Sequence, residues 1–177
     1  ISAVQLLEEL GYNVRIPKIK ESGRTYLSKG LIRKAKKIAE KNLDILKELI
    51  SEDRPLIGIE PSAILSFRDE YPDFFKNGET FKSIASNIAK HSYMIDEFLE
   101  KEILAKNISE EQFTTDTKHI KLHGHCQQKA VASTLPTKRI LSFPKNYTIE
   151  EIPSGCCGMA GSFGYEKEHY ELSMKIG

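Results

Sequence analysis

The sequence predicts a three-layer α/β fold with a mainly parallel sheet, because short apolar runs alternate with longer segments of helical periodicity. Strands are expected at residues 13–17, 55–60, 118–123 and 147–152, and helices at residues 3–10, 28–50, 80–105, 127–135 and 165–176. Gly11 is a stop signal for the first helix, Ser28 is a candidate N-cap for the second, and Pro61 is expected to break the chain after the second strand. Ser109, with Gln112 three residues later, is typical of a capping box at one further helical turn.

Composition and charge argue against several functional classes. The chain has 177 residues and a formal net charge of +1, which gives no overall electrostatic case for binding nucleic acid or an anionic membrane. No apolar run reaches roughly 18 residues, so the sequence predicts no transmembrane segment, and it shows no signal peptide. These features predict a cytoplasmic location. Ile1 and Gly177 both fall in or beside helical patterns, and we expect the chain to be part of a longer polypeptide.

A group of cations falls within and just before the helix expected at residues 28–50. Its members are Lys29, Arg33, Lys34, Lys36, Lys37 and Lys41. We interpret the group as a solvated helix face, with a docking surface as the alternative.

The cysteines indicate metal binding or redox chemistry. The chain has three, at positions 126, 156 and 157, and an odd, clustered set without a signal peptide argues against a disulfide framework. Cys126 follows His123-Gly124-His125 where a strand is expected to end and a helix to begin, which is the edge of a parallel sheet where ligands bind. A thiol at a helix N-terminus favours the thiolate that a metal needs. The alternative for Cys126 alone is a small buried apolar residue.

A glycine-rich loop surrounds the cysteine pair. Glycines recur at positions 155, 158, 161 and 164, so the backbone can approach a ligand closely. The loop lacks the GxxxxGK[ST] pattern of a phosphate-binding loop, and adjacent cysteines seldom bond to each other. Two neighbouring thiolates among backbone amides suit an iron–sulfur cluster, whose sulfurs accept N–H bonds.

A weak internal repeat is visible. Residues 12–17 followed by Glu21-Ser22-Gly23 parallel residues 147–153 followed by Cys156-Cys157-Gly158. Two matched segments this short are equally consistent with duplication and with chance.

The segment from His123 to Cys126 and the later Cys156-Cys157-Gly158-Met159-Ala160-Gly161-Ser162-Phe163-Gly164-Tyr165 together resemble the signature of the CCG, or cysteine-rich, domain family of iron–sulfur oxidoreductases. The family includes the cysteine-rich component of heterodisulfide reductase, the iron–sulfur components of glycolate oxidase and anaerobic glycerol-3-phosphate dehydrogenase, and FAD-linked D-lactate dehydrogenase-like proteins. The resemblance covers essentially the whole chain and implies two pseudo-repeated Rossmann-like lobes. We expect residues 1–110 to form the first lobe and residues 111–177 the second.

The resemblance implies an electron-relay role. Cys126, Cys156 and Cys157 would hold an iron–sulfur cluster, with Gly155 and Gly158 beside it, and no residue of the chain would be catalytic. The parent protein would oxidise a 2-hydroxyacid such as D-lactate or glycolate at FAD, which would lie in a flavin domain or subunit outside this chain, since no GxGxxG motif is present. Electrons would pass to a quinone or thiol acceptor, which allows peripheral association with the inner face of a membrane.

The chain departs from the family pattern at several ligand positions. Glu21 and Ser22 stand where the first repeat would have its cysteine pair, and Ala63 where another cysteine often lies. The family's later cysteine segment would fall beyond residue 177, so we expect a cluster to be lost easily from this fragment, which alone would be inactive. His123 and His125 are possible substitute ligands. A non-catalytic docking module with a structural Cys₃His zinc site is therefore the alternative function.

Overall fold

The computed structural model describes residues 1–75, 80–155 and 163–176, and these form a mixed α/β structure. The first part of the chain contains α1 (Ser2–Glu9), α2 (Arg24–Ser28), α3 (Ile32–Leu46), β1 (Leu56–Gly58), α4 (Pro61–Arg68), α5 (Glu70–Phe74), α6 (Lys82–Lys90), β2 (Ser92–Met94) and α7 (Ile95–Leu104). A 3₁₀ turn follows at Glu110–Gln112. The second part contains β3 (Lys118–Leu122), α8 (Cys126–Val131), α9 (Leu135–Leu141), β4 (Tyr147–Glu151), 3₁₀ turns at Phe163–Tyr165 and Lys167–His169, and α10 (Tyr170–Ile176).

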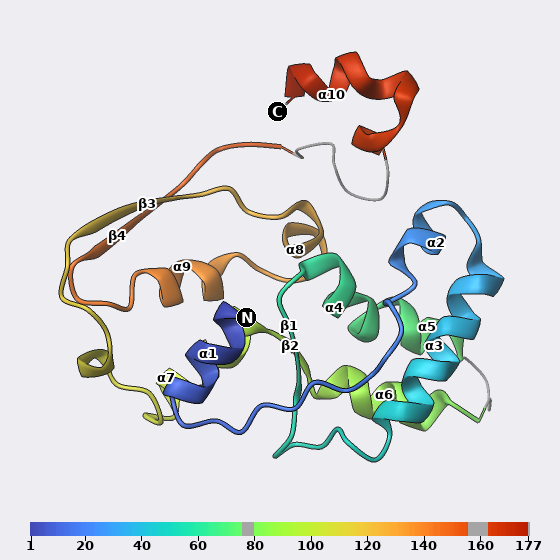
Figure 1. Cartoon of the computed structure of the whole chain (residues 1–177), viewed down its shortest axis with the longest axis horizontal. Coiled ribbons are helices and arrows are strands. Elements are labelled where there is room, and N and C mark those ends of the chain that lie inside the picture. The colour runs from blue at the N-terminus through green and yellow to red at the C-terminus, as the bar shows by residue number, and fades with distance from the viewer. Residues whose placement is uncertain (76–79, 156–162, 177) are drawn as a thin grey trace.

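The strands are parallel, as predicted, but the described residues form two separate pairs instead of one continuous sheet (Figure 1). β1 pairs with β2 in a register that places Leu56 opposite Ser92, and β3 pairs with β4 so that Lys118 lies opposite Tyr147. Each pair is connected through helices, as parallel pairing requires. The α/β class is therefore confirmed, whereas the Rossmann-like architecture of each lobe remains a prediction.

Several predicted elements are confirmed, with some bounds shifted. The first helix ends beside Gly11, whose φ of 92° lies in the left-handed region. The capping box is present, with the Ser109 N–H donating to Gln112 Oε1 at 2.8 Å. The strands at 118–123 and 147–152 correspond to β3 and β4, and the strand at 55–60 is shortened to β1.

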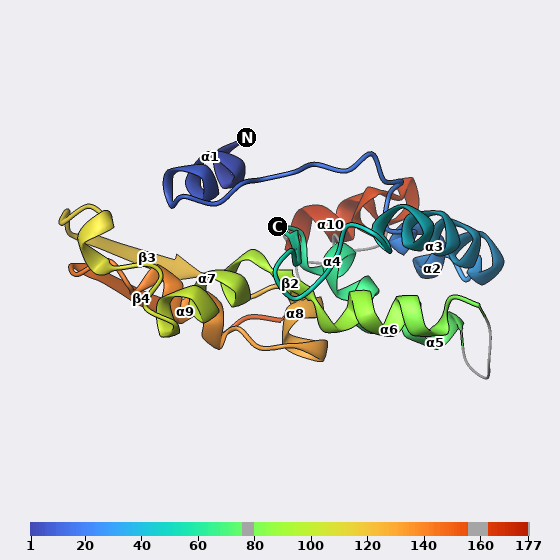
Figure 2. The same cartoon turned by 90° about the horizontal axis from the view of Figure 1, so that it is seen from below.

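Other predicted elements are wrong. Residues 13–17 form no strand; the segment crosses the molecule from α1 towards α2 and α3 (Figure 2), and Val14 packs against apolar side chains instead of pairing with a sheet. Ser28 does not cap α3 but ends α2, because Gly30, with φ of 71°, turns the chain before Ile32. The long helix expected at residues 80–105 is divided by β2, whose pairing with β1 buries Met94.

Proline positions account for two further errors. Pro61 does not simply end the strand but occupies the first turn of α4, where its missing N–H costs nothing. The helix expected at residues 127–135 ends at Val131, and the sequence analysis missed α9, which has Pro136 in its first turn. Farther along, the helix expected at residues 165–176 is regular only from Tyr170 onward.

Apart from Pro144, the buried hydrophobic side chains of the described structure all lie at or before Ile108. One cluster joins α3, α4, α5, α6 and β2, and a second joins α1 and α7 through Leu7, Phe98 and Leu99. From the second part of the chain, Ile140 and Phe143 pack against the second cluster as partly buried side chains. The described residues after 111 therefore pack on a core that the first part of the chain supplies.

A buried polar group anchors the segment that enters α2. Asn42 on α3 accepts from the Lys20 N–H at 2.8 Å and donates to the Glu21 carbonyl at 3.0 Å. Tyr71 accepts from Asn42 at 3.1 Å and donates to the Ser22 carbonyl at 3.0 Å. Because both side chains are fully buried, residues 20–22 are held to the core through their backbone.

The cations of residues 29–41 are partly engaged within the protein. Lys29 forms an ion pair with Glu166, Lys34 lies over the Tyr26 ring, and Lys36 lies over the Phe75 ring. Arg33, Lys37 and Lys41 are exposed, which fits a solvated helix face; docking at this surface is untested.

Gly58 allows α4 to pack closely on β1. A Cβ atom at this position would lie 2.3 Å from Ile64 Cβ and 2.7 Å from Ile64 Cγ1, far inside van der Waals contact. Ile64 is buried in the main core, so it has little room to move. Glycine is therefore required here for close packing of a helix on a strand.

We expect Gly58→Ala to lower the free energy of unfolding by about 1–3 kcal/mol, because the added methyl group overpacks the core. Urea denaturation would measure this change. Gly155→Ala is the control: a Cβ at Gly155 meets no atom within 4 Å, and its effect should stay within about 0.5 kcal/mol. Equal effects of the two substitutions would contradict the packing argument.

We expect the buried phenol of Tyr71 to make the protein less stable at high pH. Burial raises the pKa of its phenol to about 12 by disfavouring the phenolate. The neutral Tyr71 phenol therefore contributes fully to stability below the unfolded-state pKa of about 10. As the pH rises towards 12, the free energy of unfolding falls by on the order of 2 kcal/mol, because the unfolded state loses this proton first. Urea denaturation between pH 9 and 12 should show a shallower decline in Tyr71→Phe than in the wild type. Identical slopes would show that this phenol does not contribute to the loss of stability at high pH.

Candidate functional site

The predicted thiol lies at a strand-to-helix junction, as expected. β3 ends at Leu122, His123 and Gly124 form the turn, His125 is the N-cap, and Cys126 is the first residue of α8. The Cys126 side chain is half-buried. The thiol therefore lies beyond the carboxyl end of a parallel strand, where ligands bind in α/β folds.

The turn before Cys126 is tightly filled. A Cβ on Gly124 would lie 2.7 Å from Lys129 Cε and 2.8 Å from Thr134 Cγ2. Glu151, at the end of β4, accepts from Thr134 Oγ1 at 3.1 Å and pairs with Lys138 at 2.8 Å. The hydrogen bond from Lys138, and then that from Thr134, lower the pKa of the Glu151 carboxyl. These contacts fix the end of β4 against the turn.

Two hydrogen bonds hold the segment after β4 beside α8. His123 Nε2 lies 3.2 Å from the Gly155 carbonyl oxygen, and Lys129 Nζ donates to the Ser154 carbonyl at 3.0 Å. The chain that leads into Cys156 is thus attached to the same short stretch that carries Cys126. Cys156, Cys157 and Gly158 themselves lie outside the described residues, so the convergence of the three thiols stays a prediction.

The hydrogen bonds also distinguish the two histidines. His125 Nδ1 accepts the Gln127 N–H at 3.2 Å, so this nitrogen already serves as the cap of α8. A carbonyl oxygen can only accept, so His123 Nε2 must carry the proton in its bond to Gly155. A neutral His123 therefore has its lone pair on Nδ1. Of the two, His123 is the better suited to bind a metal.

A buried polar cluster connects α8 to α7 and α9. Gln128, which is only 5% exposed, lies with its Nε2 2.8–3.0 Å from Asp96 Oδ2, the Ser133 carbonyl and Thr137 Oγ1. Thr137 also donates to Asp96. Asp96 lies just after β2, so the cluster connects the carboxyl end of the first strand pair to the helix that begins at Cys126. The sequence analysis missed it, because nothing in the local pattern relates these three positions.

The positions where the first repeat would carry cysteines have structural roles. Ser22 Oγ accepts the Arg24 N–H at 3.3 Å, and the Ala63 N–H donates to Glu60 Oε2 at 2.6 Å. Arg24 forms an ion pair with Glu70 and also reaches Gln127 Oε1 at 3.4 Å. The degenerate positions thus lie near the α8 N-terminus, in a segment held by hydrogen bonds.

No three His, Cys, Asp or Glu side chains gather closely enough to hold a metal ion in residues 1–75, 80–155 and 163–176. Two of the three predicted thiols fall in the gap between the last two ranges, so this result leaves the metal prediction untested. Within the same described ranges, no helix has both the length and the apolar character needed to cross a bilayer.

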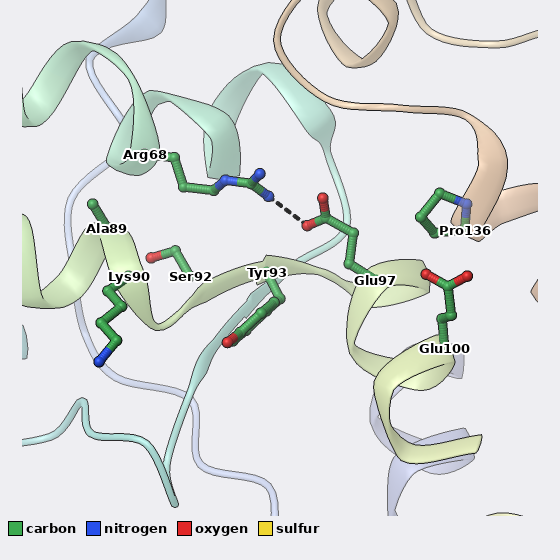
Figure 3. Close-up of a pocket in the computed structure, with 8 residues that line it drawn as sticks. All are labelled: Arg68, Ala89, Lys90, Ser92, Tyr93, Glu97, Glu100 and Pro136. Carbon is green, nitrogen blue, oxygen red and sulfur yellow. Dashed lines mark hydrogen bonds and ion pairs between the residues drawn. The ribbon is translucent and has the colours of Figure 1, made fainter. Parts of the chain in front are cut away.

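A cavity of about 460 Å³ lies at the other end of α4 from this site. Its lining comprises Arg68, Ala89, Lys90, Ser92, Tyr93, Glu97, Glu100 and Pro136 (Figure 3). Three of the four charged side chains there form ion pairs: Arg68 with Glu97, and Glu100 with Arg139, both at 2.5 Å. Arg68 ends α4, which is about 12 Å long, so the cavity is separate from Cys126. It offers no thiol and no reactive pair.

The fold and the site define the class of the chain. It is an α/β chain with parallel strands and a thiol at a strand-to-helix junction. Hydrogen bonds hold this junction to the segment that leads into a cysteine pair. Similar sequences come from oxidoreductases. The chain is 29% identical over 178 residues to D-2-hydroxyglutarate dehydrogenase of Haemophilus influenzae, with 98% of the chain and 17% of the relative covered. It is 26% identical over 180 residues to one component of the anaerobic glycerol-3-phosphate dehydrogenase of Escherichia coli, covering 98% of the chain and 42% of that component.

A third relative is lactate utilization protein A of Macrococcus caseolyticus, 23% identical over 166 residues, covering 92% of the chain and 64% of the relative. The names of these proteins fit the family that the cysteine motif resembles. The chain spans about one sixth of the length of the D-2-hydroxyglutarate dehydrogenases it matches. No family model matches the chain. No solved structure matches it either.

We expect Gln128→Leu to lower the free energy of unfolding by about 1–3 kcal/mol, because it leaves Asp96 and the Ser133 carbonyl without their buried donor. Gln127→Leu is the matched control, since Gln127 makes only a long contact with Arg24, and it should change stability by about 0.5 kcal/mol or less. Urea denaturation of both variants measures the difference. A Gln128 effect no larger than the control would show that the cluster does not hold α8.

Proposed function

We propose that this chain is the iron–sulfur module of a flavin-linked oxidoreductase and relays electrons through a cluster held by Cys126, Cys156 and Cys157. The observation that carries the proposal is the attachment of residues 154 and 155 to α8 by His123 and Lys129. Because Cys156 directly follows Gly155, this attachment brings the entrance of the cysteine pair to the helix that begins with Cys126. The relatives, all named as parts of dehydrogenase or lactate-utilization systems, support the same role.

The described residues fit an iron–sulfur cluster. Cys126 occupies the first position of α8, Gly124 leaves no side chain in the turn, and a Cβ at Gly155 would meet only open space. Gly155 and Gly158 flank the cysteine pair in the sequence and would let its backbone approach the cluster closely. A cluster bound here would accept and release single electrons.

The chain's own residues would bind and orient, and none would be catalytic. His123 donates from Nε2 to the Gly155 carbonyl and keeps the loop entrance against the strand end. Gln128 fixes α8 through its buried hydrogen bonds, which limits the movement of Cys126. The first lobe would be a scaffold without a cluster, because Glu21, Ser22 and Ala63 stand at its ligand positions and are held by structural hydrogen bonds.

The reaction of the whole protein follows from the relatives and the family resemblance. FAD in a separate domain or subunit would oxidise a 2-hydroxyacid, a class that includes D-lactate, glycolate and the 2-hydroxyglutarate in the relatives' names. Electrons would reach this chain and leave to a quinone or thiol acceptor. The site would work in the cytoplasm or at the inner face of the membrane.

A structural zinc site of the Cys₃His type is the second candidate. Its support is His123, whose bond to Gly155 leaves the Nδ1 lone pair for a metal close to Cys126. In that case the chain would be a non-catalytic docking module. The two candidates differ in metal content and in the response of the fold to chelation.

Metal analysis of the anaerobically purified full-length protein decides between them. We expect iron and sulfide in the wild type, a clear loss of both in Cys157→Ser, and wild-type content in Ser22→Ala, which serves as the matched control in the first lobe. The 177-residue chain purified in air should be folded but colourless, since a cluster exposed to oxygen is oxidised and lost. Stoichiometric zinc with unfolding on chelation would instead establish the docking module, and iron loss in Ser22→Ala would refute the scaffold role of the first lobe.

A further inference from the structure

Two helices of different lobes begin close to each other. α4 starts after β1 with Glu60 as its N-cap, and α8 starts after β3 with His125 as its N-cap. The two helices pack together (Figure 1). Their capping residues, Glu60 and His125, lie beside each other beyond β1 and β3. Each cap accepts the N–H of the residue two positions later, which is Ser62 in α4 and Gln127 in α8.

Both caps are unusual residues for this position. Ser, Thr, Asp, Asn and Gly are the favoured N-caps, because a short side chain suffices to accept the exposed N–H groups. Glu60 is one methylene longer than Asp, yet its two oxygens still accept from the Ser62 N–H at 3.1 Å and the Ala63 N–H at 2.6 Å. Capping alone does not require this length or an imidazole ring at residue 125.

The additional length brings the two caps into contact. His125 Nε2 lies 3.6 Å from Glu60 Oε1, and the two side chains are 32% and 56% exposed. Because His125 Nδ1 accepts the Gln127 N–H, it carries no proton, and the ring proton is on Nε2, which faces the carboxylate. The Gln127 N–H thus fixes the tautomer, and the Glu60 carboxylate lies where it favours this orientation of the ring.

We infer that Glu60 is a positioning residue for Cys126 and acts through His125. The carboxylate of the first lobe holds the imidazole, the imidazole holds the first turn of α8, and Cys126 is the first residue of that turn. The cysteine-free lobe thus contributes to the thiol site by setting its geometry. The consequence for a cluster rests on the proposed function, whereas the position of the thiol can be measured without any metal.

The substitution Glu60→Asp separates capping from positioning. Asp is a favoured N-cap and keeps α4 stable, but its carboxylate is withdrawn from His125 by one methylene. Glu60→Gln is the rescue variant, because its carboxamide oxygen keeps both the length and an acceptor for Nε2–H. Glu97→Asp is the matched control: Glu97 also accepts a backbone N–H, that of Met94 at 3.0 Å, but pairs with Arg68 at the opposite end of α4.

The first measurement is the rate at which iodoacetamide alkylates Cys126 in the reduced, metal-free chain, followed by mass spectrometry of the peptide that contains it. We expect alkylation to be about two- to fivefold faster in Glu60→Asp, the range that a weak, partly exposed contact with a carboxylate can produce, because α8 loosens around the half-buried sulfur. Glu60→Gln and Glu97→Asp should react at the wild-type rate. His125→Asn, a good cap that cannot reach Glu60, should reproduce Glu60→Asp.

The second measurement is anaerobic reconstitution of the full-length protein with iron and sulfide, followed by iron analysis and electron paramagnetic resonance. Glu60→Asp should bind less iron or give a changed spectrum, while its thermal unfolding matches the wild type. Wild-type alkylation and spectra in Glu60→Asp would overturn the positioning role and leave the proposed function standing. A wild-type protein that takes up no iron would refute the proposed function, and the alkylation rates would still decide the role of Glu60.

Discussion

The close packing of Ile64 on Gly58 sets the position of α4, and much of the structure depends on it. With no side chain on Gly58, the buried face of α4 can lie directly against β1, while the same helix packs against β2, α5, α6 and α8. Ile64, Leu65 and Phe67 thereby become part of the main core. Since the start of α4 follows β1 by only two residues, this packing also determines where the Glu60 carboxylate lies.

The second part of the chain is held in place by contacts with the first part. Its strands β3 and β4 pair with each other, but, apart from Pro144, every buried hydrophobic side chain in the described structure precedes residue 109. The connections are instead polar or peripheral: Gln128 bonds to Asp96, and α9 packs on α7. Separating the buried Gln128 amide from the partly buried Asp96 carboxylate is costly, because the amide would lose its partner away from water. The position of the thiol helix is thus specified by a few directional bonds more than by apolar burial.

The comparison of sequence with structure shows which signals are local. β3, β4 and the start of α8 could be predicted, because alternating apolar residues and the His-Gly-His turn act over a few positions. Pro61 suggests a break in the sequence but lies in the first turn of α4, and Pro136 lies in the first turn of α9, which no local signal predicted. β2 was hidden within helical periodicity because its strand state depends on β1, more than 30 residues away. The contact of Glu60 with His125 has the same long-range origin, and no local pattern contains it.

The first part of the chain helps to hold the helix that begins at Cys126. A metal or cluster site needs rigid ligands, and rigidity comes from the residues that hold those ligands as much as from the ligands themselves. The residues before 111 contain no cysteine, but their polar side chains reach the α8 region: Asp96 bonds to Gln128, Arg24 reaches Gln127, and Glu60 faces His125. These three contacts fall on residues 125, 127 and 128, on either side of Cys126. Residues that carry no thiol can therefore still determine how tightly the neighbouring thiol is held.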